Sequence, residues 1–415
     1  MYRVWYSTES FADYIIDHTL LSQNSTIKSK MFESDANNPT RFHTMPDHIR
    51  KILYLDAPDI IVEKDNRPIF SVEVSTEAGT GHNVFQRFAR VAASVENEVP
   101  AFYIYPEGAI ISREGANPAW DMINPAIFKA LESAMQIYNM PALLYYFPSD
   151  IKSFPNPNAA NAPNMGTKGL KFDELIEKYP ACPDSTDAEM KSMFLSINEV
   201  IVAIEAKGIH GGRASLLQNR EIRKRRDFMC EQFYSKSRNR KLLSMSPLSA
   251  TIEIDTQYLI NHLKKHETGG YEIGELLKSR ESTIFYKVNA KFRGDPYPGA
   301  LAAIDYLLCR NGKTFEDRRS NLVLVFGDMS VNDENQTIEV TSTKSTIDGF
   351  FKDVKDCEKH NLLPRSYEDL KNSDIPRYFM QVRYGSTYSK KKHIRVFSYF
   401  ADAILFPDGS LWRDG

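Results

Sequence analysis

The sequence predicts an α/β fold in which helices flank a mixed central sheet and a large α+β portion follows toward the C-terminus. A short apolar strand, 60–62, and a second strand, 69–75, are separated by a polar turn and predict a β-hairpin. Apolar residues at three- and four-residue spacing predict helices that alternate with further strands. The length of 415 residues allows two or three domains, or one large domain with elaborations.

The predicted elements of the first third follow from spacing and from capping residues. The proline- and asparagine-rich loop 154–164 then predicts a boundary between a core over 1–153 and a second portion over 165–415. In order, we expect helices over 9–21 and 47–53, the hairpin, a helix over 83–95 capped by Asn83, a strand over 101–105, a helix over 125–138 and a strand over 142–147.

Composition and charge are typical of a globular protein with a sizeable core. Hydrophobic residues make up 42% of the chain and charged residues 26%. The formal net charge of −2 excludes a uniformly basic nucleic-acid-binding coat but allows a local basic cleft. The four cysteines are far apart and form no CxxC pair, so we expect reduced thiols in a cytoplasmic protein. No apolar run is long enough to span a bilayer, and we expect no membrane partner.

The hairpin is predicted to bring two carboxylates together. Side chains alternate along a strand, so one face carries Ile69, Ser71, Glu73 and Ser75, and the other carries the apolar Phe70, Val72 and Val74. The apolar face should pack against the core. Asp59 precedes the first strand of the hairpin and should lie beside Glu73. Two such carboxylates, next to a helix that carries Gln86 and Arg90, can hold a magnesium ion.

Pro58-Asp59 and Glu73-Val74-Ser75 resemble the motif of the PD-(D/E)XK nucleases, the superfamily that holds most type II restriction endonucleases. The resemblance covers about the first third of the chain and implies a restriction-endonuclease-like core with a bound Mg²⁺. We expect Asp59, Glu73 and the Val74 carbonyl as metal ligands. Gln86 is expected either to orient a water or a phosphate or to make a structural hydrogen bond.

The lysine of that motif is replaced by Ser75. A hydroxyl carries no positive charge, so Ser75 can only hydrogen-bond a metal-bound water. The missing cation must therefore come from Lys64, Arg87 or Arg90, or from a second metal ion.

A second literal match to the motif, Pro183-Asp184 with Glu205-Ala206-Lys207, even keeps the lysine. The residues between its two halves have helical spacing, and Gly208 is expected to end that helix. Because Glu205 would then lie far from Asp184, we interpret this match as accidental.

The most basic part of the chain, 213–241, interleaves cations with aromatic residues. Basic side chains at this density neutralise phosphates, although a solvated helix face is the alternative. A further cationic segment, 389–393, is predicted to be a hairpin tip. Contacts with double-stranded DNA are expected from Arg220, Arg223, Lys224, Arg226, Arg238, Lys241 and Lys391.

Beyond the basic segment, the sequence predicts a mixture of strands and helices. The expected elements are a strand over 283–290, a turn-rich loop over 292–299, a helix over 300–309, and strands over 322–326, 378–382 and 394–400.

Together these features predict a magnesium-dependent, sequence-specific endonuclease of the type II restriction class that hydrolyses phosphodiester bonds in double-stranded DNA. The resemblance implies a homodimer, because cutting both strands of a palindrome needs two active sites. A DNA methyltransferase is the expected functional companion. Two alternatives stay open: a DNA-binding protein whose nuclease core has lost catalysis, and a DNA-repair or RNA-directed nuclease without sequence specificity.

Overall fold

A computed structural model shows two compact units, the first comprising the described residues up to Ser246 and the second those from Pro247 onward. Within the part of the chain that the structure describes, every helix is too short or too polar to traverse a lipid bilayer. The described residues are 1–31, 45–77, 81–112, 114–159, 168–265, 275–288, 296–314, 316–341, 396–397, 399–406 and 409–412.

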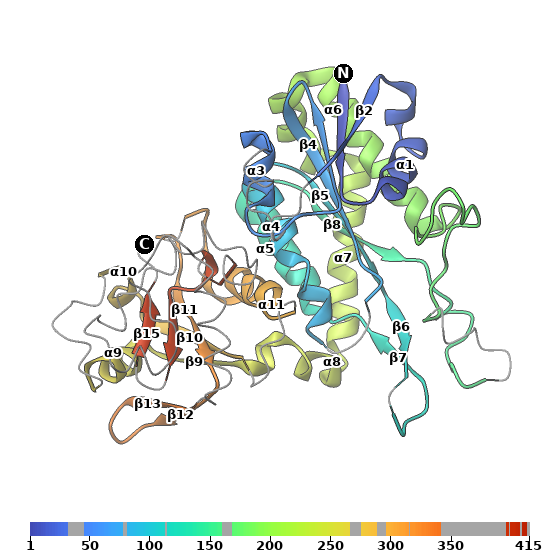
Figure 1. Cartoon of the computed structure of the whole chain (residues 1–415). Helices are drawn as coiled ribbons and strands as arrows, with labels where there is room; N and C mark the ends of the chain where they lie inside the picture. The colour runs from blue at the N-terminus through green and yellow to red at the C-terminus, as the bar shows by residue number, and fades with distance from the viewer. Residues whose placement is uncertain are drawn as a thin grey trace. The chain divides into compact units, whose positions relative to one another are not determined.

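A six-stranded sheet forms the centre of the first unit, with the strand order β2-β1-β3-β4-β5-β8 (Figure 1). β3 is antiparallel to both β1 and β4, whereas the other neighbouring pairs are parallel, so the predicted mixed sheet is confirmed. Its strands are β1 (Tyr2–Tyr6), β2 (Thr26–Lys30), β3 (Ile60–Lys64), β4 (Arg67–Val74), β5 (Ala101–Pro106) and β8 (Ala142–Phe147).

Helices cover both faces of this sheet, as predicted. On one face, Ser71 of β4 is hydrogen-bonded to Ser94 of α4 at 2.8 Å between their hydroxyl oxygens. On the other face, the Tyr145 hydroxyl of β8 donates to Ser196 of α6 at 2.7 Å. Consecutive residues of β4 are buried, so both of its faces are covered and not only the apolar one. The helices of this unit are α1 (Glu9–Asp17), α3 (Asp47–Leu53), α4 (Phe88–Glu96), α5 (Ala126–Tyr138), α6 (Ala188–Ser215), α7 (Arg220–Ser237) and α8 (Arg240–Ser244), with 3₁₀ turns at Leu20–Gln23, Asn83–Phe85 and Leu216–Gln218.

The compact first unit extends well past the boundary expected at 154–164. It continues to Ser246 because α6 and α7 pack against the sheet that the earlier residues form. Arg225 of α7, for example, donates from Nε to the Leu144 carbonyl of β8 at 2.6 Å. The polar composition of the loop gave no indication that the chain returns to the same core.

Several local elements differ from the predictions. β1 and β2 were not predicted, and neither was the two-stranded ribbon formed by β6 (Gly108–Ile111) and β7 (Ala119–Met122) after β5 (Figure 1). The helix expected over 83–95 begins only at Phe88, because Asn83–Phe85 forms a 3₁₀ turn. The first helix ends at Asp17, before a second 3₁₀ turn.

The second unit contains a five-stranded sheet with the order β15-β14-β11-β10-β9. The predicted strands over 283–290 and 322–326 correspond to β10 and β11. α11 begins at Pro296, inside the predicted loop, because proline is well suited to the first turn of a helix. The elements of the second unit are β9 (Thr251–Asp255), α9 (Thr256–Lys265), α10 (Glu275–Lys278), β10 (Ser282–Val288), α11 (Pro296–Ile304), a π-helix (Asp305–Cys309), β11 (Ser320–Phe326), the hairpin β12 (Asp328–Asn332) and β13 (Thr337–Thr341), β14 (Ala403–Phe406) and β15 (Gly409–Trp412).

One C-terminal strand prediction is wrong, and two other predicted segments lie outside the described residues. The described residues 396–397 and 399–400 are helical, so the strand expected over 394–400 is wrong. The segments 378–382 and 389–393, including Lys391, lie outside the described residues.

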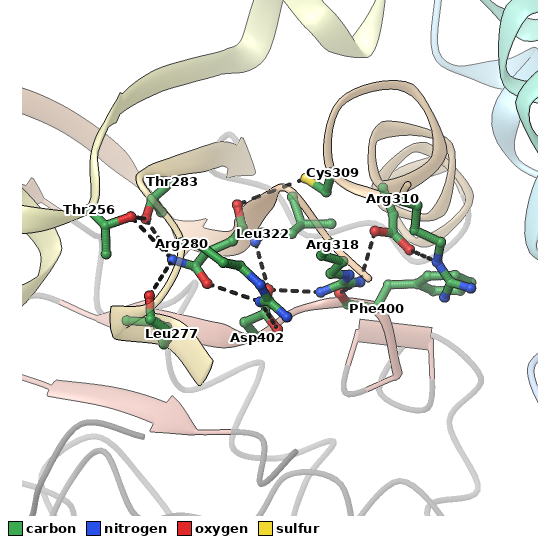
Figure 2. Close-up of polar contacts among 12 residues, drawn as sticks. Thr256, Leu277, Arg280, Thr283, Cys309, Arg310, Arg318, Leu322, Phe400 and Asp402 are labelled. Carbon is green, nitrogen blue, oxygen red and sulfur yellow. Dashed lines mark hydrogen bonds and ion pairs between the residues drawn. The ribbon is translucent and has the colours of Figure 1, made fainter. Parts of the chain in front are cut away.

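Buried ion pairs connect four segments of the second unit (Figure 2). Arg318 pairs with Asp305 at 2.9 Å and with Asp402 at 2.7 Å. Arg310 also pairs with Asp305, at 2.5 Å, and Arg280 pairs with Asp402 at 3.2 Å. We call Arg280, Asp305, Arg310, Arg318 and Asp402 the arginine–aspartate network. It holds the start of β14 against β11, since Asp402 also accepts a hydrogen bond from the backbone of β11.

Candidate active site

The hairpin of β3 and β4 brings the two predicted carboxylates together. Asp59 directly precedes β3, and the antiparallel pairing of Ile60 with Val72 sets it beside Glu73 near the end of β4. The Asp59 backbone N–H donates to Glu73 Oε2 at 3.1 Å, and the Val74 N–H donates to Asp59 Oδ2 at 2.9 Å. The three predicted metal ligands are therefore direct neighbours.

Arginines from α4 and the turn before it contact Glu73. Arg90 Nη1 donates to both Glu73 carboxylate oxygens, at 2.7 and 2.8 Å, and Arg90 Nε donates to Asp56 Oδ2 at 2.7 Å. Arg87 Nε lies 3.3 Å from Glu73 Oε1. The three acids and two arginines form one contiguous group, the acid–arginine cluster: Asp56, Asp59, Glu73, Arg87 and Arg90.

Two residues of this site were not predicted. Asp56 lies three positions before Asp59 in the same loop, which was the only signal in the sequence. Ser7 follows β1, and its hydroxyl donates to Asp59 Oδ1 at 3.1 Å. Because β1 itself was missed, nothing in the sequence indicated that Ser7 would contact a residue more than fifty positions away.

Burial and charge together determine the electrostatics of the cluster. The Glu73 side chain is 2% exposed and that of Arg87 is 18% exposed. Burial raises the pKa of Glu73 to about 8; the charge of Asp59 adds to this increase, whereas Arg90 and Arg87 oppose it. When all five groups are ionised, three acids face two arginines. One negative charge is then left for a further cation to compensate.

Lys64 lies away from Glu73, whereas the roles expected of Ser75 and Gln86 stay predictions. The Ser75 hydroxyl accepts a hydrogen bond from the Glu77 backbone at 3.3 Å, within the loop that follows β4. Gln86 is buried but precedes α4. Lys64 is at the other end of β3, where it pairs with Glu205 at 2.6 Å. The cations that contact Glu73 are therefore arginines, and Lys64 does not replace the motif lysine.

The two halves of the second motif match lie on separate elements, as predicted. Glu205 is part of α6 and contacts Lys64 and Tyr2 of the first sheet. Asp184 lies in the preceding loop, where its carboxylate accepts hydrogen bonds from the backbone and the hydroxyl of Thr186. Helical geometry breaks at Gly208, whose φ of 70° favours glycine.

The predicted basic segment forms α7 and α8, but its cations are not equivalent. Arg225 is buried, with its guanidinium over the Tyr145 ring and paired with Glu189, so it anchors α7 to the sheet. Arg226 is half-buried and lies 3.7 Å from Asp227. The side chains that face solvent are Arg220, Arg223, Lys224, Arg238, Arg240 and Lys241.

The cluster, the β6–β7 ribbon and the end of α7 lie at one edge of the central sheet. β4, β5 and β8 are parallel, so their C-terminal ends meet at the edge where Glu73 lies. The ribbon continues directly from β5. Lys236 of α7 pairs with Glu107, between β5 and β6, at 2.7 Å. The exposed Arg238 and Lys241 that follow are therefore at the same edge as the carboxylates.

The donor chemistry of the site fits a hard cation. Asp59, Glu73 and a backbone carbonyl supply oxygen ligands of the kind that Mg²⁺ prefers, in a cluster whose acids outnumber its arginines by one charge once Glu73 has lost its proton. Among the residues described, no three His, Cys, Asp or Glu side chains lie close enough together to hold a metal ion. Arg90 engages both oxygens of Glu73, so a cation could use this carboxylate only after Arg90 has moved.

Comparison with known proteins does not assign the chain to a family. No protein-family model matches it, and no curated protein or solved structure is significantly similar to it.

Proposed function

We propose that the chain is a magnesium-dependent, sequence-specific endonuclease that cuts double-stranded DNA, of the type II restriction class. The observation that carries this proposal is the direct contact of Asp59 with Glu73 at the end of a β-hairpin, beside two arginines. Phosphodiester hydrolysis requires an activated water and compensation of the charge on the phosphate and the leaving oxygen. Bound Mg²⁺ would supply Lewis-acid chemistry for both.

In this proposal Asp59, Glu73 and the Val74 carbonyl hold the metal ion. Asp59 is kept in place by the Val74 N–H and by the Ser7 hydroxyl, so its orientation is set before any ligand binds. The neutral Ser75 cannot stabilise the charge that develops on the phosphate. We assign that role to Arg87, because it is the less buried of the two arginines at Glu73.

Arg90 would act on Glu73 rather than on DNA. It holds both oxygens of this carboxylate and also Asp56, and its side chain is only 11% exposed. A buried guanidinium in two ion pairs positions its partners and is poorly placed to reach a phosphate. We therefore regard Arg90 as a positioning residue that must release one Glu73 oxygen when the cation binds.

The proposal extends to partners. The exposed cations that follow α7 and begin α8, Arg238, Arg240 and Lys241, would neutralise phosphates on DNA that approaches the same edge of the sheet as the carboxylates. Cutting both strands of a symmetric site would require a homodimer. A restriction enzyme would also need a DNA methyltransferase that protects the same sites.

Two observations favour a second candidate function, a DNA-binding protein that has lost catalysis. Arg90 engages both oxygens of Glu73, and the motif lysine is absent. If Arg90 never released Glu73, the cluster would be a structural ion pair on a nuclease-like scaffold.

A cleavage screen distinguishes these candidates. The full-length protein is incubated with a long DNA of mixed sequence in Mg²⁺ and, in parallel, in Mn²⁺. We expect discrete fragments that are absent with Asp59→Asn. Unspecific degradation would instead indicate a nuclease without sequence specificity. Sequence-selective binding without cleavage in either metal would overturn the endonuclease proposal and support the inactive DNA-binding protein.

A further inference from the structure

A cavity of about 350 Å³ lies between the β6–β7 ribbon and α8 in the first unit. Its size and mixed lining are typical of a site for a small ligand. Its apolar wall includes Ile111, Trp120, Met122, Leu242 and Met245. Its polar groups come from Asn117, Asp121, Asn239 and Lys241.

The aromatic side of this cavity is preorganised. The Trp120 indole N–H donates to the Phe154 carbonyl at 2.8 Å, which fixes one edge of the ring. Another edge rests against Gly169, whose φ is 69° and where a Cβ would collide with the indole. The opposite wall, on α8, is also held in place, because the Asn124 side chain donates to the Leu242 carbonyl at 3.1 Å. A fixed indole is a good stacking platform, since little entropy is lost when a ring packs on it.

The cavity belongs to the same edge of the sheet as the acid–arginine cluster. Its ribbon wall continues from β5, the strand beside the one that carries Glu73. Gly81, in the loop after β4, approaches the backbone of Met245 so closely that a Cβ there would collide with it. Arg238 and Lys241 at this edge are exposed. A polyanion that reaches Asp59 and Glu73 would thus pass these two cations, which lie next to the cavity.

We propose that this cavity receives one base of the DNA substrate after that base has rotated out of the duplex. The proposal rests on the proposed function, because it requires duplex DNA at this edge. Trp120 stacks on the base, and Lys241 neutralises a neighbouring phosphate. Asp121 accepts a hydrogen bond from an exocyclic amino group, which adenine, cytosine and guanine carry and thymine lacks. The cavity is therefore a specificity element separate from the cleavage chemistry.

The test uses the full-length protein, Ca²⁺ in place of Mg²⁺ and fluorescently labelled duplexes of one sequence. One duplex is fully paired, one contains an A·C mismatch, one a T·T mismatch, and one has abasic nucleotides at both mismatch positions. A mismatched base rotates out at lower cost, so the A·C duplex should bind about tenfold more tightly than the paired duplex. Relative to the paired duplex, the T·T duplex should gain less affinity than the A·C duplex, and the abasic duplex should gain no affinity.

Three variants link this preference to the cavity. Trp120→Ala should lower the affinity for the A·C duplex to about that for the paired duplex, whereas Trp120→Phe, which keeps a ring, should retain most of the preference. Lys207→Ala, an exposed lysine on α6, is the matched control and should behave as wild type. Circular dichroism confirms that each variant is folded.

The possible outcomes separate this inference from the proposed function. Tight binding of all four duplexes without an A·C preference would overturn the base-binding cavity and leave the endonuclease proposal intact. Equal gains for the A·C and abasic duplexes would also overturn it, because they would reflect flexible DNA rather than an inserted base. No binding of any duplex would overturn both proposals.

Discussion

The acid–arginine cluster of the first unit and the arginine–aspartate network of the second are both groups of five charged residues, yet they differ in burial, charge balance and access to solvent. The first has three acids and two arginines, and its Arg87 is 18% exposed. The second has three arginines and two aspartates, and none of its side chains is more than 8% exposed. Excess negative charge near solvent favours recruitment of a cation. Excess positive charge sealed in the core favours a structural role.

The surroundings of the two groups support this distinction. In the second unit, the additional arginine charge is met by neutral partners: Arg310 lies over the Tyr306 and Phe400 rings, and Arg318 donates to the Phe400 carbonyl. In the first unit, the additional acid charge is met by backbone N–H and hydroxyl donors to Asp59. A network closed by its own neighbours stabilises the fold, whereas carboxylates at the end of a sheet can accept an incoming ion.

The largest effect should follow from removing a carboxylate of the first cluster. Glu73→Gln and Asp59→Asn should each lower DNA cleavage by about a thousandfold or more, because each removes a charged ligand of the proposed metal ion. Binding of DNA in Ca²⁺ should persist. Initial rates of plasmid cleavage and gel-shift titrations provide the two measurements. A variant that cleaves at the wild-type rate would exclude that residue from the site.

In the second unit, the corresponding change should affect stability. Asp402→Ala removes an ion-pair partner of both Arg280 and Arg318 in the core. The free energy of unfolding should therefore fall by roughly 3–5 kcal/mol. Urea denaturation followed by tryptophan fluorescence or circular dichroism measures this change. Lys287→Ala, which removes an exposed ion pair with Asp328, is the control and should cost about 1 kcal/mol or less. Equal effects of the two substitutions would show that the network is not structurally important.

The pH dependence should separate the two groups further. The pKa of Glu73 is about 8, above its ordinary value of 4.5, so the folded state binds the proton more tightly than the unfolded state. Its contribution to stability is complete below pH 4.5 and is lost as the pH rises to about 8. Ionised Glu73 is the form that binds a cation, so cleavage should rise with pH as Glu73 loses its proton. Stability and rate measured against pH should show opposite trends, and Glu73→Gln should remove the stability trend. A cleavage rate that does not change between pH 6 and 8 would contradict this role.

A smaller effect is expected from the exposed face of α7. If this face tracks phosphates, log affinity for DNA should fall with log salt at a slope of roughly −0.9 per neutralised phosphate. Arg220→Ala combined with Arg223→Ala should make the slope shallower by up to about two phosphates. Anisotropy titrations over a range of salt concentrations measure it. An unchanged slope and affinity would show that this face does not contact DNA and is simply solvated.

The smallest effect is expected at the second motif match. Lys207→Ala should leave cleavage within about a fewfold of wild type, because this exposed residue lies on α6 rather than in a metal-binding hairpin. The same plasmid assay applies. A loss as large as that of Glu73→Gln would mean that the wrong hairpin has been assigned.

Local patterns predicted much of the first unit correctly. The hairpin, α3, α5, β5 and β8 have short-range signals, namely apolar periodicity, turn residues and a proline near the start of α5. β1 and β2 lack such a signal, because five-residue strands with mixed polarity are recognisable only through the neighbours that they pair with. The boundary expected at 154–164 lies inside the first compact unit for a similar reason. A polar loop looks the same whether the following helices return to the same core or build a new one.

The sequence alone determined that Asp59 and Glu73 would flank one hairpin, because strand alternation and turn residues act over a few positions. It also determined that 190–204 would be helical, and hence that the second motif match would be separated. Only the tertiary structure decided which cation meets Glu73, since the choice among Lys64, Arg87 and Arg90 depends on how α4 packs on β4. It likewise decided that Asp56 and Ser7 join the site and that Arg225 is an anchor rather than a surface charge. Ion pairs between distant segments form only when the packed core has brought them within a few ångströms, and no local pattern records that approach.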